Sequence, residues 1–246
     1  GYYALSSNTT GTFNTGIGNA ALQSSTSTGN TAVGSSALNA ALTGDYNTAV
    51  GMNAGLVMTT GDRNVAVGYQ SLDACTTGQY NVGIGNAALG SLIDSDDNTV
   101  IGTNAGAAVT TGSDNTFVGS AAGDATDDST ENTAVGKSAL SANCGNGNAA
   151  VGHAALLACT GAFNTSVGVS AGSAVTGGDN NLFLGKDAGL TGSPGGNITT
   201  GSNEIVLGDE NISEAHIQVD WTVASDQRDK TDVTPMEMGL DFVNKL

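Results

Sequence analysis

One short motif, Asn-x-x-x-Gly, recurs along most of this chain at an almost constant interval. Every step between successive asparagines is 16 or 17 residues, and no large insertion interrupts the series. The asparagines are Asn14, Asn30, Asn47, Asn64, Asn81, Asn98, Asn115, Asn132, Asn148, Asn164 and Asn181. A fixed period this short predicts a solenoid in which each repeat forms one coil. A solenoid presents an extended surface, which favours a structural or adhesive role.

The composition limits both the core and the partners. There are 37 Gly, 2 Pro and 1 Trp in 246 residues, so we expect a thin core of Ala, Val and Thr. The net charge of −17 repels phosphate backbones and anionic membranes, and we expect no nucleic-acid partner. No apolar run is long enough to insert in a membrane, and the start lacks a signal peptide. We expect a soluble segment of a longer protein.

Each repeat begins with a short predicted strand. Counting the asparagine as position 0, position 1 is mostly Thr, position 2 is mostly Ala or Gly, and position 3 is always aliphatic, as in Thr48-Ala49-Val50. Positions 2 and 3 of a strand point to opposite faces, so the pattern predicts that both faces are buried. One coil can cover only one face with its own return segment. We therefore expect a homo-oligomer in which the small position 2 allows a close approach between chains.

The asparagine and glycine columns predict how the corners are held. The glycine at position 4 is typical of a tight corner that excludes a Cβ, and the asparagine side chain is expected to bind the turn backbone or the asparagine of the next coil. This structural ladder includes Asn47, Gly51, Asn64, Gly68, Asn98, Gly102, Asn132 and Gly136. An Ala-Leu or Ala-Gly pair after each corner predicts a second inward contact, and the remainder of each repeat is expected to be a solvent loop.

The repeated Asn-Thr-Ala-Val-Gly-x-x-Ala units resemble the head repeats of trimeric autotransporter adhesins and related repeats in phage tail fibres. The likeness runs from residue 8 to about 190. It implies an all-β, left-handed parallel β-roll, or β-solenoid, of about eleven coils that forms a homotrimer. We assign residues 1–190 to this repeat domain.

The pattern changes after the repeats. Residues 191–224 are expected to form a terminal coil, with a last strand within 203–208 and a closing strand over 215–223. Residues 225–246 resemble the start of the intramolecular chaperone domain of phage endosialidases and tail spikes (peptidase S74-like), through Ser225-Asp226-x-Arg-x-Lys230 and a following Gly-Leu-Asp. The resemblance implies that the incomplete domain helps the trimer assemble and then cleaves itself off. Ser225 and Asp226 would flank the cut, and Lys230 would assist as a base. Thr234-Pro235 independently predicts a short helix from about residue 235.

Three further groups of residues are candidates for particular chemistry: acidic residues in the loops, aromatic residues before the asparagines, and cysteines. Acidic residues gather in the loops before the asparagines, where a solvated surface is favoured over a Ca²⁺ site because no calcium-binding repeat is present: Asp45, Asp62, Asp94, Asp96, Asp97, Asp114, Asp127, Asp128, Glu131 and Asp179. Tyr46, Tyr80 and Phe163 share the position before the asparagine and are candidate glycan contacts, although packing within the loop, which needs no ligand, is favoured. Cys75, Cys144 and Cys159 are expected to be buried free thiols, with a Cys144–Cys159 disulfide as the alternative.

The sequence therefore favours a receptor-binding, structural segment of a phage tail fibre or spike. The expected partners are two further copies of the chain and a glycan or protein receptor on the host, and the expected location is the virion. No motif for a cofactor or metal occurs, and neither His153 nor His216 has a second histidine at the spacing of a metal site. No enzyme activity is expected beyond the single self-cleavage. The alternatives are the head of a cell-surface trimeric adhesin and, less favoured, a polysaccharide-degrading tail spike.

Overall fold

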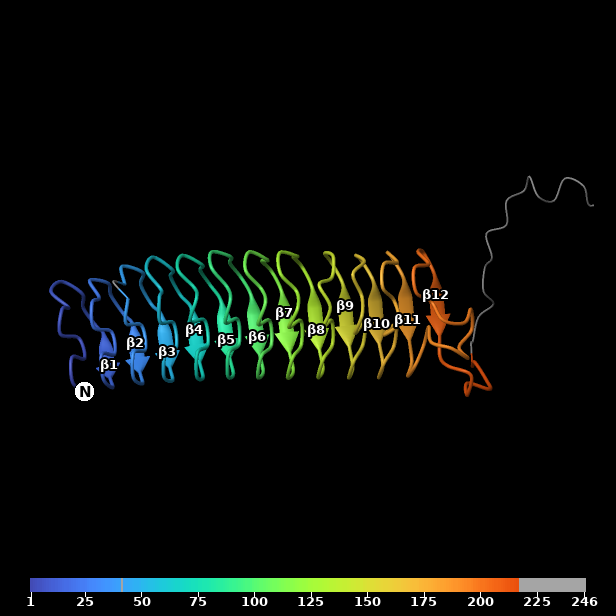
Figure 1. Cartoon of the computed structure of the whole chain (residues 1–246), viewed down its shortest axis with the longest axis horizontal. Coiled ribbons are helices and arrows are strands. Elements are labelled where there is room, and N and C mark those ends of the chain that lie inside the picture. Colours follow the sequence, from blue (N-terminus) through green and yellow to red (C-terminus); the bar gives the residue numbers. More distant parts are fainter. Residues whose placement is uncertain (41, 217–246) are drawn as a thin grey trace, which may run out of the picture. The chain divides into compact units, whose positions relative to one another are not determined.

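The computed structural model describes residues 1–40 and 42–216, and the chain divides into two compact units, Gly1–Ile212 and Ser213–Leu246. The first unit is an all-β solenoid, as predicted, and no helix occurs within the described residues. Its strands form one parallel sheet along one side of the stacked coils (Figure 1). The strands are β1 (Thr15–Ile17), β2 (Thr31–Val33), β3 (Thr48–Val50), β4 (Val65–Val67), β5 (Val82–Ile84), β6 (Thr99–Ile101), β7 (Thr116–Val118), β8 (Thr133–Val135), β9 (Ala149–Val151), β10 (Thr165–Val167), β11 (Leu182–Leu184) and β12 (Ile205–Leu207).

The strands are stacked in sequence order and in register with the repeat. Ala49 pairs with Ala66 and Val50 pairs with Val67, so each repeat position forms a column along the sheet. The predicted last strand is confirmed as β12, because Leu182 of β11 pairs with Ile205 despite the longer connection between them. The handedness and the trimer remain predictions.

The side chains of the strands correct one expectation. Position 2 faces the inside of the coil, where Ala49 and Ala134 are fully buried, and position 3 faces outward, where Val50 and Val135 are each 38% exposed. The prediction that the small column lies between chains was therefore wrong. Most residues at this position are small because the return segment of the same coil packs directly on them. Within a single chain only one face of the sheet is buried.

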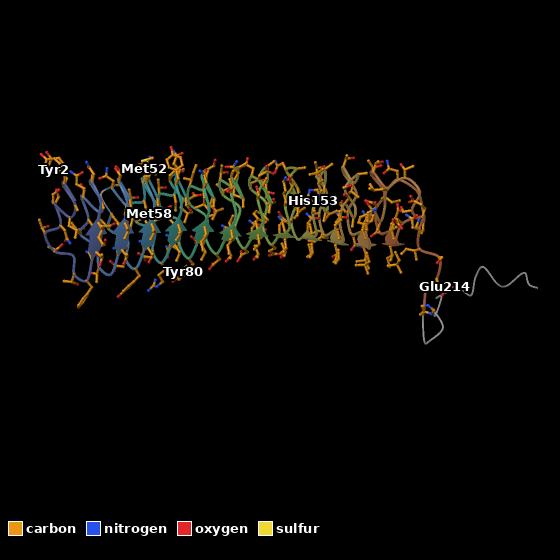
Figure 2. All side chains as sticks on the ribbon, turned by 90° about the horizontal axis from the view of Figure 1, so that it is seen from below. Tyr2, Met52, Met58, Tyr80, His153 and Glu214 are labelled. Atoms are coloured by element: carbon orange, nitrogen blue, oxygen red, sulfur yellow. The ribbon has the colours of Figure 1, made fainter. Side chains whose placement is uncertain are left out.

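A third inward column lies in the segment expected to be a solvent loop. About eleven residues after each asparagine an apolar or small side chain is buried, as at Leu42, Met58, Cys75, Leu92 and Val109. Figure 2 shows Met58 inside the coils. The three cysteines belong to this column, and they are buried and free, as predicted. Burial raises the pKa of the Cys75 thiol to about 12 and that of Cys159 to about 11.

The Ala-Leu and Ala-Gly pairs are buried, as predicted, and the choice between Leu and Gly follows the volume of their neighbours. The second residue of each pair has a left-handed backbone, with a φ of 53° at Leu89 and 60° at Gly123. A Cβ on Gly123 would lie 2.5 Å from the ring of Phe117, which occupies the usually small position 2. A Cβ on Gly189 would meet Phe183 at the same distance. At Gly123 and Gly189, glycine therefore takes the place of leucine because phenylalanine fills the core beside it.

The asparagine column forms a buried hydrogen-bonded ladder, as predicted. The Oδ1 atom of Asn64 accepts a bond from the backbone N–H of Asn81 at 2.9 Å, and its Nδ2 atom donates to the carbonyl of Gly78 at 2.7 Å. The same pattern links most successive coils. Asn132 differs because its buried Nδ2 atom has no partner among the residues that the structure describes. Each rung ties one coil to the next and satisfies backbone groups inside the turn.

The glycine corners allow the coils to approach closely. Gly51 has a φ of 141°, and a Cβ built on it would lie 2.3 Å from the carbonyl oxygen of Gly68 in the next coil. That atom belongs to the backbone and cannot move without separating the coils. The corner therefore requires glycine, which confirms the prediction for Gly51, Gly68, Gly102 and Gly136.

Candidate functional site: the outer face of the sheet

The outer face carries a continuous column of aliphatic side chains, which we name the outer ladder. Its exposed members range from 38% exposure at Val135 to 58% at Ile17. Position 1 lies beside it on the same face and is mostly threonine. The outer ladder consists of Ile17, Val33, Val50, Val67, Ile84, Ile101, Val118, Val135, Val151, Val167, Leu184 and Leu207. Monomeric proteins rarely expose an apolar surface this continuous, so it marks a place of contact.

The residue before each ladder asparagine projects from the same face and forms a second column, which we name the rim. Its members have left-handed backbones, with φ values of 60° at Tyr46 and 59° at Phe163. The rim consists of Phe13, Gly29, Tyr46, Arg63, Tyr80, Asp97, Asp114, Glu131, Gly147, Phe163, Asn180 and Asn203. Figure 2 shows Tyr80 projecting outward from the sheet. The three aromatic residues predicted as glycan contacts all belong to this column.

Two of those aromatics, Tyr46 and Tyr80, enclose a cation. The guanidinium of Arg63 lies 5.6 Å from the ring centre of Tyr46 and 5.5 Å from that of Tyr80. Arg63 also donates a hydrogen bond to the Tyr80 hydroxyl at 3.2 Å. The Tyr46 ring packs on Gly29, where a Cβ would lie only 2.7 Å from it. These rings are occupied by contacts within the chain, which stabilise the rim through cation–π attraction.

The loop carboxylates have a structural role that the sequence did not reveal. The Oδ1 atoms of Asp45, Asp62 and Asp96 each accept a bond of 2.7 Å from a backbone N–H of the preceding coil. Asp179 does the same for Ala162 at 2.8 Å. These carboxylates form a second ladder between coils, whereas Asp97, Asp114 and Glu131 lie on the rim. Among the described residues, no group of three or more His, Cys, Asp or Glu side chains is arranged to hold a metal ion.

The third aromatic, Phe163, lies at a pocket near the end of the sheet. The pocket has a volume of about 330 Å³ and is lined by Phe163, Thr165, Asn180, Asn181, Leu182, Asn203, Glu204 and Ile205. Phe163 is 62% exposed, and one edge of its ring packs on Gly147. Asn180 donates a hydrogen bond from Nδ2 to Oδ1 of Asn203 at 2.8 Å. The pocket thus combines an aromatic ring with a linked pair of amides.

The long connection before β12 explains this arrangement. Glu204 takes the place of the ladder asparagine, because its backbone N–H donates to Oδ1 of Asn181 at 2.9 Å. Asn203 is thereby placed on the rim beside Asn180. The sequence signal was the irregular spacing of the last repeat, but it did not predict a pocket.

A second pocket of about 450 Å³ lies near the same end of the first unit. Asp187 and Glu210 line it together with Ala174, Leu190, Thr191 and Asn197. Asp187 is ion-paired with Lys186, and the neighbouring carboxylates raise the pKa of that exposed lysine. The chain itself therefore neutralises part of the acidic charge beside this pocket.

The chain matches no protein-family model, no curated protein and no solved structure. The described residues also include no helix with the length and apolarity needed to cross a bilayer. The predicted cleavage residues Ser225, Asp226 and Lys230 and the helix from residue 235 lie outside the described residues. The closing strand predicted over 215–223 lies outside them from residue 217 on, and residues 215 and 216 are not in a strand. His153 and His216 are both exposed. The outer ladder and the rim are therefore the candidate functional surface among the described residues.

Proposed function

We propose that this chain is a rod-shaped, receptor-binding segment of a phage tail fibre or spike, and that three copies assemble through the outer ladder. The observation that carries the proposal is the outer ladder itself, because a chain that hydrogen-bonds every coil to the next still leaves one apolar column exposed. The resemblance of the repeats and of residues 225–246 to tail-fibre and chaperone sequences supports the placement in a virion.

The energetics of the outer ladder favour association. Burying the exposed part of each aliphatic side chain contributes roughly 0.5–1 kcal/mol, or roughly 6–12 kcal/mol for each chain over the whole column. That range is comparable with the cost of bringing chains together. The columns run straight along the sheet, so identical chains in parallel can match coil to coil around an axis beside the sheet.

Cross-linking tests the proposed interface. Val135→Cys places a thiol on the outer ladder, whereas Asp128→Cys places one on an exposed loop of a neighbouring coil. The native cysteines are buried and should not react. Mild oxidation should link copies through Val135→Cys and leave Asp128→Cys unlinked. Equal linking of both variants would contradict an interface at the outer ladder.

Attachment tests the receptor-binding role. Fluorescently labelled chain should remain on washed cells of strains that the parent particle infects and should wash off resistant strains. Equal retention on both sets of strains would contradict selective receptor binding.

A further inference from the structure

We propose that the pocket at Phe163 binds one or two units of a neutral saccharide on the host surface. This inference rests on the proposed receptor-binding function and names the chemistry of the receptor. It also separates Phe163 from the other two aromatic residues of the rim, because Tyr46 and Tyr80 are occupied by Arg63.

The aromatic ring provides the apolar part of the site. Phe163 is 62% exposed, and its ring is the only aromatic group in a pocket of about 330 Å³ within the described residues. A volume of this size is at the lower end of the range of small-molecule sites, about 300–1,000 Å³, and suits one or two sugar rings. The C–H face of a sugar can pack on an aromatic face, while Leu182 and Ile205 extend the apolar floor.

The amide pair provides directional hydrogen bonds. The hydrogen bond from Asn180 Nδ2 to Asn203 Oδ1 is 2.8 Å long and holds the two side chains together. It leaves Oδ1 of Asn180 as an acceptor and Nδ2 of Asn203 as a donor, and neither atom has a hydrogen-bond partner in the described part of the chain. An adjacent acceptor and donor match two neighbouring hydroxyl groups, each of which can donate and accept. The hydroxyl of Thr165 adds a third polar group.

The charge of the pocket selects against acidic sugars. None of the lining residues of the pocket is basic. The whole chain carries a net charge of −17, which repels anions as they approach. A carboxylated or sulfated sugar would therefore bind more weakly than a neutral one of the same shape. Phe163, Asn180 and Asn203 lie on the rim, and Thr165, Leu182 and Ile205 hold position 1 between the rim and the outer ladder. The pocket therefore lies at the margin of the proposed interface, which buries position 3.

An array of neutral and anionic oligosaccharides tests the proposal with the full chain. The wild-type protein should bind a subset of the neutral glycans and none of the anionic ones. Phe163→Ala should weaken this binding by at least about tenfold, which corresponds to about 1.4 kcal/mol. Tyr80→Ala is the matched control, because it removes a rim aromatic with the same backbone conformation outside the pocket, and it should stay within about twofold of wild type. Asn203→Leu should also weaken binding, while light scattering checks that the three variants keep the wild-type mass.

The outcomes separate this inference from the proposed function. If wild type attaches to host cells and binds no neutral saccharide, or if Phe163→Ala and wild type bind alike, the pocket proposal is overturned and receptor binding stands. If wild type neither attaches to the cells nor binds a glycan, both fail. Equal loss in Phe163→Ala and Tyr80→Ala would also overturn the assignment, because it would place binding on the rim as a whole.

Discussion

Replacing Asn81 with alanine should destabilise the solenoid at one identifiable rung. The Asn81 side chain is fully buried and accepts a bond from the backbone N–H of Asn98 at 3.1 Å. It donates to the carbonyl of Ser95 at 2.8 Å. Alanine would leave this N–H and this carbonyl unpaired in the interior. At about 1–3 kcal/mol for each buried unpaired group, the expected loss is about 2–6 kcal/mol of the free energy of unfolding.

Two other asparagines provide controls for this prediction. Asn86 lies on the same coil but is exposed, so Asn86→Ala should change the stability by less than about 0.5 kcal/mol. Asn132 occupies a rung whose Nδ2 atom has no partner among the described residues, so Asn132→Ala removes fewer bonds and should cost less than Asn81→Ala.

Denaturant unfolding gives the stability differences, and hydrogen exchange gives their location. The backbone N–H of Asn98 should lose its protection in Asn81→Ala and keep it in Asn86→Ala. Because a solenoid can open at one coil while the others stay folded, exchange at Asn98 is the more direct readout. An Asn81→Ala protein with the stability and the Asn98 protection of wild type would refute the ladder as a source of stability.

Three further predictions follow from single residues. Gly68→Ala should lower the free energy of unfolding by several kcal/mol, because the new Cβ would lie 2.2 Å from the carbonyl oxygen of Gly85. Gly177→Ala should be nearly neutral, because a Cβ there would have no atom within 4 Å. Similar melting temperatures for the two variants would contradict the close approach of the coils. Burial raises the pKa of Asp73, so the stability that its carboxyl group contributes is present in acid and is lost as the pH rises through the folded pKa. Between about pH 3 and pH 7 the Asp73→Asn protein should therefore lose less of its free energy of unfolding than wild type. An equal loss in the two proteins would contradict the raised pKa of Asp73. If residues 225–246 begin a self-cleaving chaperone, protein expressed from the full reading frame should be cut between Ser225 and Asp226. Mass spectrometry should show that the Ser225→Ala and Lys230→Ala proteins stay whole. Efficient cutting of either variant would exclude this role for the substituted residue.

The repeat pattern was sufficient to predict the coils, the register and the function of the asparagine and glycine columns. These features are set locally, since Asn64 and Gly68 make the same contacts in their coil as their counterparts make in the other coils. The faces of the strand were not predictable in this way, because Ala134 and Val135 are both apolar. Which of them points inward depends on how closely the return segment packs, and the sequence does not state that distance.

The candidate site was predicted only in part. Phe163 was identified from its position before an asparagine, as were Tyr46 and Tyr80, but the sequence did not distinguish among them. The distinction arises from neighbours one coil away: Arg63 lies over the tyrosine rings, whereas Asn180 lines a pocket next to Phe163. Such contacts between coils depend on residues 17 apart, and the pocket also depends on an irregular connection that places Asn203 on the rim.

The mass of the assembled protein tests the central claim most directly. Multi-angle light scattering of the wild-type chain should give a mass near three times the 24.1 kDa of one chain. Val135→Asp combined with Val151→Asp should give a single folded chain with an unchanged circular dichroism spectrum, because both side chains are already about 40% exposed in one chain and a charge there blocks only the interface. A wild-type protein that is a stable, well-folded monomer would contradict the account.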